Sequence, residues 1–330
     1  MKTFIKYSLV LCGLTLAMLA LSEHLSKVPA LIGSVHFGLL GGAFLGLLGY
    51  QIWNAGVWSE VLKAMGVDCK RLDCTRIWLE SESLKWIPGT VWSYGSRVVT
   101  AKKLGVSKQK ASSSIVLELM LTNVAWAIMA SLIVFSSETM SLLSSLGEQA
   151  WTYLTERAWL LATMALGAVA ASVLVGFYAS KSPRVRSLLQ LREIDLKRCA
   201  AVVVHYLLLC VFNASMMWLV LRAIPSIEIS LLSVMGLAGV AWLAGFWAIG
   251  VPGGVGVREA VIVLIVSQFG PVDSAVLAAV LWRGLQMAAE ITALLASVTY
   301  GASMFMKKSI GKKGELCVQE NHSVCPVAHR

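Results

Sequence analysis

A succession of apolar stretches, most of them close to twenty residues long and separated by short polar connectors, strongly constrains how this chain can fold. A helix of about 20 apolar residues is long enough to cross the hydrocarbon core of a bilayer. Hydrophobic residues make up 57% of the sequence and charged residues 14%, which leaves too little polar surface for a water-soluble domain. We therefore predict an all-α, polytopic membrane helix bundle with about eight spans. The expected apolar segments cover residues 7–21, 29–53, 114–135, 159–178, 200–221, 229–249, 260–269 and 274–304.

The formal net charge of +10 is carried mainly by the connectors between the apolar stretches. Basic connectors stay on the cytoplasmic side of a membrane, so this pattern indicates membrane topology and not a nucleic-acid interface. It predicts a multi-pass protein of the plasma (inner) membrane with both termini in the cytoplasm. We expect one membrane-embedded domain, residues 1–305, followed by a short, basic and disordered tail, residues 306–330.

Two Pro-Gly pairs interrupt the apolar pattern, Pro88-Gly89 and Pro252-Gly253, and each is followed within ten residues by an arginine. Proline removes a backbone donor and glycine permits unusual backbone angles, so each pair should end a helix inside or at the edge of the membrane. The freed backbone groups need protein or water as partners, and paired broken segments in two halves indicate a transporter's binding site. The pattern predicts an internal repeat with two broken, re-entrant segments, and plain helix kinks are the alternative.

Ionisable side chains within or beside the predicted spans are costly and usually face the interior of the bundle. Glu118 lies near the start of the span at 114–135, and Arg283 and Glu290 share one stripe of the last span. The helix that restarts after the second Pro-Gly pair offers unpaired N–H groups, and Arg258 adds a cation that suits phosphate. These features predict a polar cavity that accepts an anionic headgroup. Alternatively, the charged residues only pair with one another and fix the packing of the helices.

The run from Lys85 to Trp92, followed by Arg97, the Leu-Gly-Val series at 104–106 and Glu118, resembles the lysylphosphatidylglycerol synthase transmembrane region family. The run from Pro252 to Glu259 and the arginine of the last span, Arg283, extend this resemblance to the second half, up to about residue 305. The resemblance implies that the protein handles a lipid, without fixing which lipid.

The family's pattern residues fall on ten positions of this sequence, and two further residues, reached from the sequence pattern alone, complete the expected substrate-binding set. The ten are Pro88, Gly89, Trp92, Arg97, Glu118, Pro252, Gly253, Gly256, Glu259 and Arg283, and the two are Arg258 and Glu290. No catalytic residue, metal ion or cofactor is expected. Because only about 25 residues follow the last span, we do not expect the aminoacyl transferase activity of the larger family members.

The favoured hypothesis is a non-enzymatic translocase that flips an anionic phospholipid or a polyprenyl-phosphate-linked glycolipid. The three arginines of the set would hold the phosphate, and Glu118 and Glu259 would balance them in the empty site. The sequence contains no Walker-type phosphate loop, so passive movement or ion coupling is expected instead of direct use of ATP. One alternative is an integral-membrane transferase in which Glu118 or Glu259 acts as a base. Another is a non-catalytic partner subunit of an envelope-polymer synthase, and a homo-oligomer or envelope-synthesis enzymes remain open as protein partners.

The seven cysteines lie in spans, in basic connectors and in the tail. Thiols on the cytoplasmic side stay reduced, so we predict no disulfide. Cys317, His322, Cys325 and His329 offer four zinc-binding groups, but their spacing matches no standard zinc finger. A disordered tail is therefore favoured over a metal site.

Overall fold

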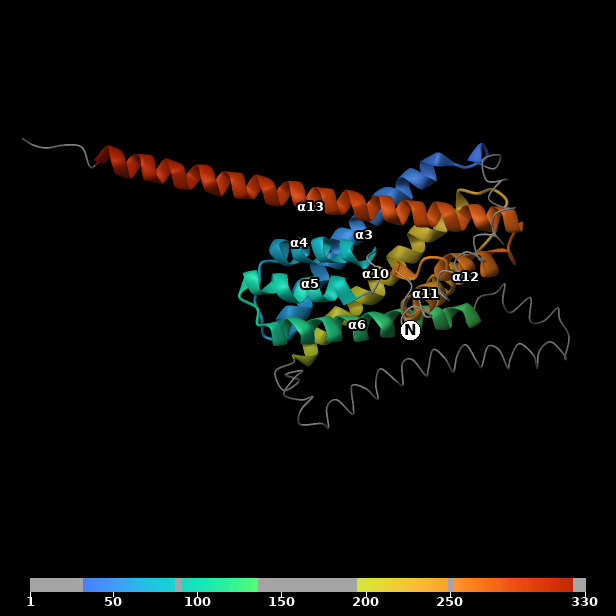
Figure 1. Cartoon of the computed structure of the whole chain (residues 1–330). Coiled ribbons are helices and arrows are strands. Elements are labelled where there is room, and N and C mark those ends of the chain that lie inside the picture. The colour runs from blue at the N-terminus through green and yellow to red at the C-terminus, as the bar shows by residue number, and fades with distance from the viewer. Residues whose placement is uncertain (1–31, 87–90, 136–194, 249–251, 323–330) are drawn as a thin grey trace, which may run out of the picture.

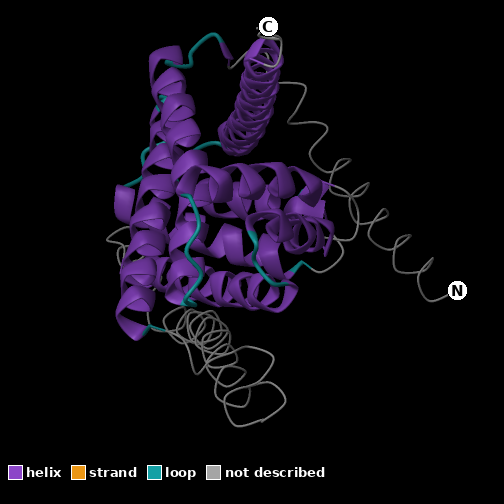
Figure 2. Cartoon of the chain, turned by 90° about the vertical axis from the view of Figure 1, so that its left-hand side faces the viewer, coloured by secondary structure: helices purple, strands orange, loops and turns teal. Residues whose placement is uncertain are grey.

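The computed structural model describes residues 32–86, 91–135, 195–248 and 252–322, and every regular element in these ranges is a helix (Figure 1, Figure 2). The all-α prediction is therefore confirmed. In chain order the elements are α3 (Phe37–Ala64), α4 (Arg71–Glu82), the 3₁₀ helix η1 (Ser83–Trp86), α5 (Val91–Ala101), η2 (Lys102–Leu104), α6 (Lys108–Ser131), η3 (Leu132–Phe135), α10 (Leu196–Arg222), α11 (Leu231–Trp247), η5 (Pro252–Gly254), α12 (Val257–Val266) and α13 (Val272–His322).

Within the described ranges, three segments are both long and apolar enough to cross a bilayer: Lys108–Ser131, Lys197–Arg222 and Val272–Thr299. A fourth apolar helix, Leu231–Trp247, is shorter. These helices identify the protein as a helical membrane bundle. The expected spans at 7–21 and 159–178 lie outside the described residues, so the total of about eight spans stays a prediction.

Polar residues mark the starts of three of these helices. The side chains of Ser107, Asp195 and Ser230 each accept a hydrogen bond from a backbone N–H in the first turn of α6, α10 and α11. Such N-caps satisfy amide groups that have no partner within the helix. A short polar residue before each apolar run therefore fixes where that helix begins.

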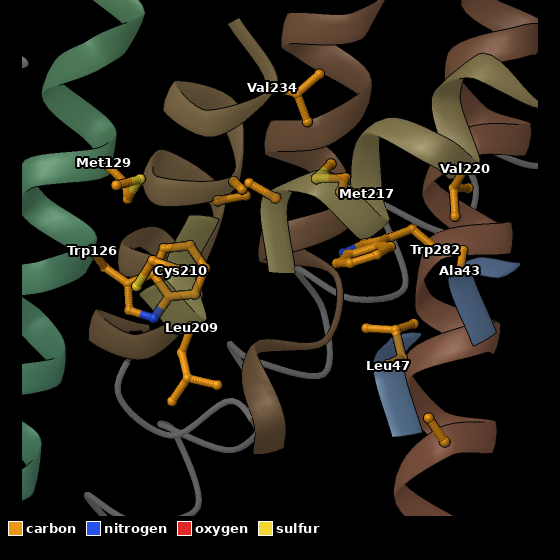
Figure 3. Packing of buried hydrophobic residues seen from close by; sticks show 14 of the residues in the cluster. Ala43, Leu47, Trp126, Met129, Leu209, Cys210, Met217, Val220, Val234 and Trp282 are labelled. Carbon is orange, nitrogen blue, oxygen red and sulfur yellow. The ribbon is translucent and has the colours of Figure 1, made fainter. Parts of the chain in front are cut away.

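The core is one continuous hydrophobic cluster that joins the long helices. Figure 3 shows part of it, with Ala43 and Leu47 from α3, Met217 and Val220 from α10, and Trp282 from α13. All five side chains are buried. The pair α3 and α10 forms the most extensive helix contact, and α13 packs across α3, α4 and α12 (Figure 1). These contacts set the frame in which the polar residues lie.

Glycines allow α11 to approach α6 and η3 at the distance of backbone contact. A Cβ atom at Gly236 would lie 2.6 Å from the Cα of Ile133, and one at Gly239 would lie 2.8 Å from the Cα of Ala130. Real Cβ atoms do not come so close, so only glycine fits. Gly46 of α3 also lies in close contact with another helix, because a Cβ atom there would overlap the side chain of Met216 of α10.

The second Pro-Gly pair interrupts the helical path as predicted. Between α11 and α12 the chain forms the short turn η5, in which Gly253 has a φ of 58°. Gly254 and Gly256 also have positive φ values, of 69° and 84°. L-residues rarely adopt this conformation, which explains the glycines. The first pair, Pro88-Gly89, lies outside the described residues, but η1, which immediately precedes it, contacts η5.

The last helix extends past the predicted boundary of the membrane domain. Figure 1 shows α13 continuing beyond the rest of the bundle, and its backbone is helical as far as His322. The boundary of the membrane domain at residue 305 and the character of the tail stay predictions. Most residues of the stretch 306–322, chiefly Lys, Glu and Met, favour helix, and the two glycines within it do not interrupt the helix.

The expectation that all cysteines are reduced is also corrected. Cys69 and Cys74 form a disulfide across the entry to α4. The two residues are only five positions apart, and the turn before α4 brings their sulfur atoms together.

We predict that Gly239→Ala destabilises the protein whereas Gly284→Ala does not. Alanine favours helix over glycine by about 1 kcal/mol at an exposed position. Gly284 is such a position, because a Cβ atom added there would meet no atom of another described element within 4 Å. At position 239 the added methyl group overlaps the backbone of α6 and should cost about 1–3 kcal/mol. The melting temperatures of both variants and of the wild-type protein are measured by thermal unfolding in detergent. Equal melting temperatures would show that α11 and α6 are not in backbone contact.

Candidate functional site

A cavity of about 290 Å³ lies at the centre of the described bundle, where η1 meets η5. Residues from α3, α4, η1, α5, α6, α10, α11, η5, α12 and α13 line it. Its charged lining consists of three cations and three carboxylates, and Tyr50, Gln51, Asn213 and Gln286 add uncharged polar groups. The charged residues are Lys85, Arg97, Arg258, Glu82, Glu118 and Glu290.

Arg97 and Glu118 form a buried ion pair at one side of the cavity. The distance from Arg97 Nη1 to Glu118 Oε2 is 2.6 Å, and Arg97 is only 1% exposed. Trp78 Nε1 donates a hydrogen bond of 2.8 Å to the other carboxylate oxygen, Glu118 Oε1. The guanidinium also lies over the rings of Trp58 and Trp78, at 5.5 and 5.2 Å from their centres. Both charges are therefore held in fixed positions by neutralising contacts.

The Arg97 pair belongs to a chain of charges that ties four elements to α13. Arg97 Nε donates to Ser81, and its Nη2 lies 3.5 Å from Glu82 Oε2. Lys85 of η1 bridges Glu82, at 3.3 Å, and Glu290 of α13, at 2.8 Å. Charges alternate along this chain, so each carboxylate has a cation within 4 Å.

A second ion pair stabilises the broken segment. Arg283 Nε lies 3.2 Å from Glu259 Oε1, and Arg283 Nη2 donates to the carbonyl oxygen of Gly253. Glu259 in turn accepts a hydrogen bond from the backbone N–H of Gly256 at the start of α12. The pair therefore satisfies both a carbonyl and an amide that the break in the helix leaves without helical partners.

Arg258 differs from the other arginines of the site. In the described part of the chain its guanidinium has no ion pair or hydrogen bond, and its buried Nε has no hydrogen-bond partner. Among the described residues, the guanidinium makes a cation–π contact with Trp242, in which Cζ lies 5.9 Å from the ring centre. The side chain lies over Gly245, where a Cβ atom would overlap it. Gly245 thus leaves room for a cation that faces the cavity.

The arrangement gives the cavity a local positive region within a lining that is neutral overall. The three carboxylates of the lining form ion pairs with Arg97 or Lys85, and none of them forms one with Arg258 in the described structure. A guanidinium with a buried Nε that lacks a hydrogen-bond partner is unfavourable unless it meets an anion. Chemically, the site can bind an anionic group and hydrogen-bond the polar atoms next to it.

One known protein family matches most of the chain. Residues 5–293 match the model of the family described as Lysylphosphatidylglycerol synthase TM region. The chain belongs to this family. A search of curated proteins found no match. Membership in the lysylphosphatidylglycerol synthase TM region family supports a lipid-related role in the membrane, and by itself it does not decide whether that role is catalytic.

The structure brings five of the twelve predicted residues of this family member to the wall of the central cavity. They are Arg97, Glu118, Gly253, Arg258 and Glu290. Glu259 and Arg283 line a smaller adjoining cavity that shares Arg258 with the first.

The other five predicted residues lie elsewhere. Pro252 begins η5, and Gly256 is the N-cap of α12. Trp92 is 59% exposed and is absent from the lining of the cavity. Pro88 and Gly89 lie outside the described residues. Arg97 pairs with Glu118 and Arg283 with Glu259, whereas Arg258 pairs with neither carboxylate. Substrate binding by these residues stays a prediction.

Several residues of the cavity were missed in the sequence. Glu82 and Lys85 lie in the broken first segment, but their charges gave no sign of pairing with Arg97 and Glu290. Tyr50, Gln51 and Asn54 form a polar group at the end of an apolar stretch, a signal that could have identified α3 as a wall of the site. Trp78 and Trp58 support Arg97 through contacts that no local pattern reveals.

We predict that Arg97→Gln and Glu118→Gln each lower the free energy of unfolding by about 3–5 kcal/mol, because each leaves a buried charge without its partner. The double variant should lose clearly less than the sum of the two. Arg76→Gln is the matched control, since Arg76 pairs with Glu80 at 2.8 Å on a partly exposed face of the same region and should cost less than about 1 kcal/mol. Unfolding in detergent gives the free energy of unfolding of the four variants relative to the wild-type protein. Additive losses would contradict a direct pair.

Proposed function

We propose that this protein flips an anionic phospholipid or polyprenyl-phosphate-linked glycolipid across the inner membrane, with the headgroup in the central cavity. In this proposal the protein is a translocase and not an enzyme, and both termini lie in the cytoplasm. The hydrocarbon chains stay in the bilayer while the headgroup crosses through the bundle.

The observation that carries the proposal is Arg258. It is the cation of the cavity wall that has no acidic partner among the described residues. A guanidinium forms paired hydrogen bonds with phosphate oxygens, which suits a lipid phosphate. Its position beside η5, where the backbone is broken, matches the way in which transporters form binding sites from interrupted helices.

A second polar group supports a headgroup that carries hydroxyls. Glu290 Oε1 is held by Lys85, whereas Oε2 is buried and has no hydrogen-bond partner within the described residues. A hydroxyl of glycerol or of a sugar could donate to this oxygen while the phosphate meets Arg258. Both side chains line the same cavity.

The paired charges lower the cost of moving a charged group through the membrane. An isolated charge in hydrocarbon is costly, and a polar cavity replaces part of its lost hydration. The chain of alternating charges from Glu290 to Glu118 contains three carboxylates and two cations and supplies donors and acceptors. Arg258 is the third cation of the cavity wall and makes the charged lining neutral overall. Glu118, with one oxygen held by Arg97 and the other by Trp78, is poorly disposed to act as the base of a transferase.

The test is lipid flipping in liposomes that contain fluorescent phospholipids or polyprenyl-phosphate sugars. The wild-type protein should speed the exposure of headgroups to a membrane-impermeant quencher. Arg258→Gln should slow flipping by at least about tenfold, because a charge-assisted hydrogen bond contributes about 1.5–3 kcal/mol. Arg258→Lys should retain part of the rate, since it keeps the charge but loses the paired geometry.

Arg198→Gln is the control for this test. Arg198 is exposed, pairs with Asp195 at the start of α10 and is absent from the cavity lining, so flipping should be unchanged. Flipping at the wild-type rate by Arg258→Gln would contradict a role for this arginine. If no lipid is flipped at all, the proposal fails and the transferase or the partner subunit gains support.

A further inference from the structure

A further hollow, distinct from the small cavity lined by Glu259 and Arg283, adjoins the central cavity between α4, η1 and α13. It has a volume of about 150 Å³, and we call it the lateral groove. The groove shares four lining residues with the central cavity, Gln51, Trp78, Glu82 and Glu290. The four residues that it adds are Leu79, Ser83, Ile291 and Leu294. The wall therefore changes from charged and polar to mainly apolar away from the centre.

The apolar end of the groove reaches a face of α13 that is covered by no other described element. Ile291, which lines the groove, is 54% exposed, and its neighbours along this face, Leu295 and Val298, are 59% and 51% exposed. Large exposed apolar side chains on a helix that spans a membrane face hydrocarbon. Within the described residues, the groove therefore leads from the charged cavity to an apolar face of α13 and not to a polar one.

The Lys85–Glu290 pair lies where the two hollows meet. Lys85 lines the central cavity, and Glu290 lines both hollows. Glu82, the second carboxylate beside Lys85, also lines both. A molecule that occupied both hollows would thus have its polar part among charges and its apolar part beyond them.

We propose that the lateral groove binds a hydrocarbon chain of the lipid whose headgroup occupies the central cavity. This proposal rests on the proposed function and adds the path by which the lipid enters from the bilayer, between α4 and α13. The continuity of the two hollows and the change from charged to apolar lining match the two parts of such a lipid.

The proposal is tested with two photoreactive phospholipids, one carrying a diazirine on an acyl chain and the other carrying it on the headgroup. Purified full-length protein in vesicles of phosphatidylglycerol and phosphatidylcholine is irradiated, and the labelled residues are mapped by mass spectrometry. The chain probe should label Leu79, Ile291 and Leu294, and the headgroup probe should label residues of the central cavity.

Leu294→Trp and Leu295→Trp form a matched pair of variants. Both place an indole on neighbouring residues of α13, but only Leu294 lines the groove. Filling the groove should reduce labelling of Leu79 by the chain probe by about tenfold, whereas Leu295→Trp should leave it unchanged. Equal labelling of Leu79 in both variants would overturn the proposal, because lipid would then only surround the helices.

The two probes separate this proposal from the proposed function. Labelling of the cavity by the headgroup probe without labelling of the groove by the chain probe would overturn the lateral groove alone. Absence of labelling by both probes would overturn both proposals. Labelling by both, with the loss in Leu294→Trp, is the supporting result.

Discussion

The buried ion pair between Arg97 and Glu118 is the interaction on which the rest of the site depends. A lone charge inside a membrane bundle is unstable, so each of these residues can be buried only because the other is within 2.6 Å. Because Arg97 comes from α5 and Glu118 from α6, their pairing fixes these helices against each other. Trp78 of α4 and Trp58 of α3 complete the arrangement and bring a third and a fourth helix to the same point.

Arg258 differs from Arg97 and Arg283 because it forms no ion pair in the described structure. The carboxylates of the cavity are bound to Arg97 and Lys85, and Glu259 is bound to Arg283, so no carboxylate recorded in the described structure pairs with Arg258. The paired residues hold the walls and the broken segment in place, whereas the unpaired one is available for a ligand. We propose that this division, with Arg258 as the ligand-binding charge, is the reason that so many ionisable residues occur in one membrane bundle.

The sequence predicted the class of fold, and five residues of the predicted site line the central cavity, because both leave local signals. Apolar stretches identified the helices, and Pro252-Gly253 identified the broken segment that η5 forms. The sequence did not distinguish Arg258 from Arg97, because pairing depends on residues far apart in the chain. Lys85 and Glu290, which meet at 2.8 Å, are separated by 205 positions. Trp92 matched the family pattern, yet its side chain is exposed on α5, so a motif position does not by itself indicate contact with the cavity.

In the proposed function, Arg258 binds the phosphate of a lipid, and this binding can be measured directly. Native mass spectrometry of the protein released from detergent can compare retention of phosphatidylglycerol with retention of diacylglycerol, which has the same chains but no phosphate. We expect wild-type protein to retain phosphatidylglycerol in preference to diacylglycerol, and Arg258→Gln to lose this preference while remaining folded. Equal retention of the two lipids by wild-type protein, or an unchanged preference in Arg258→Gln, would contradict the account.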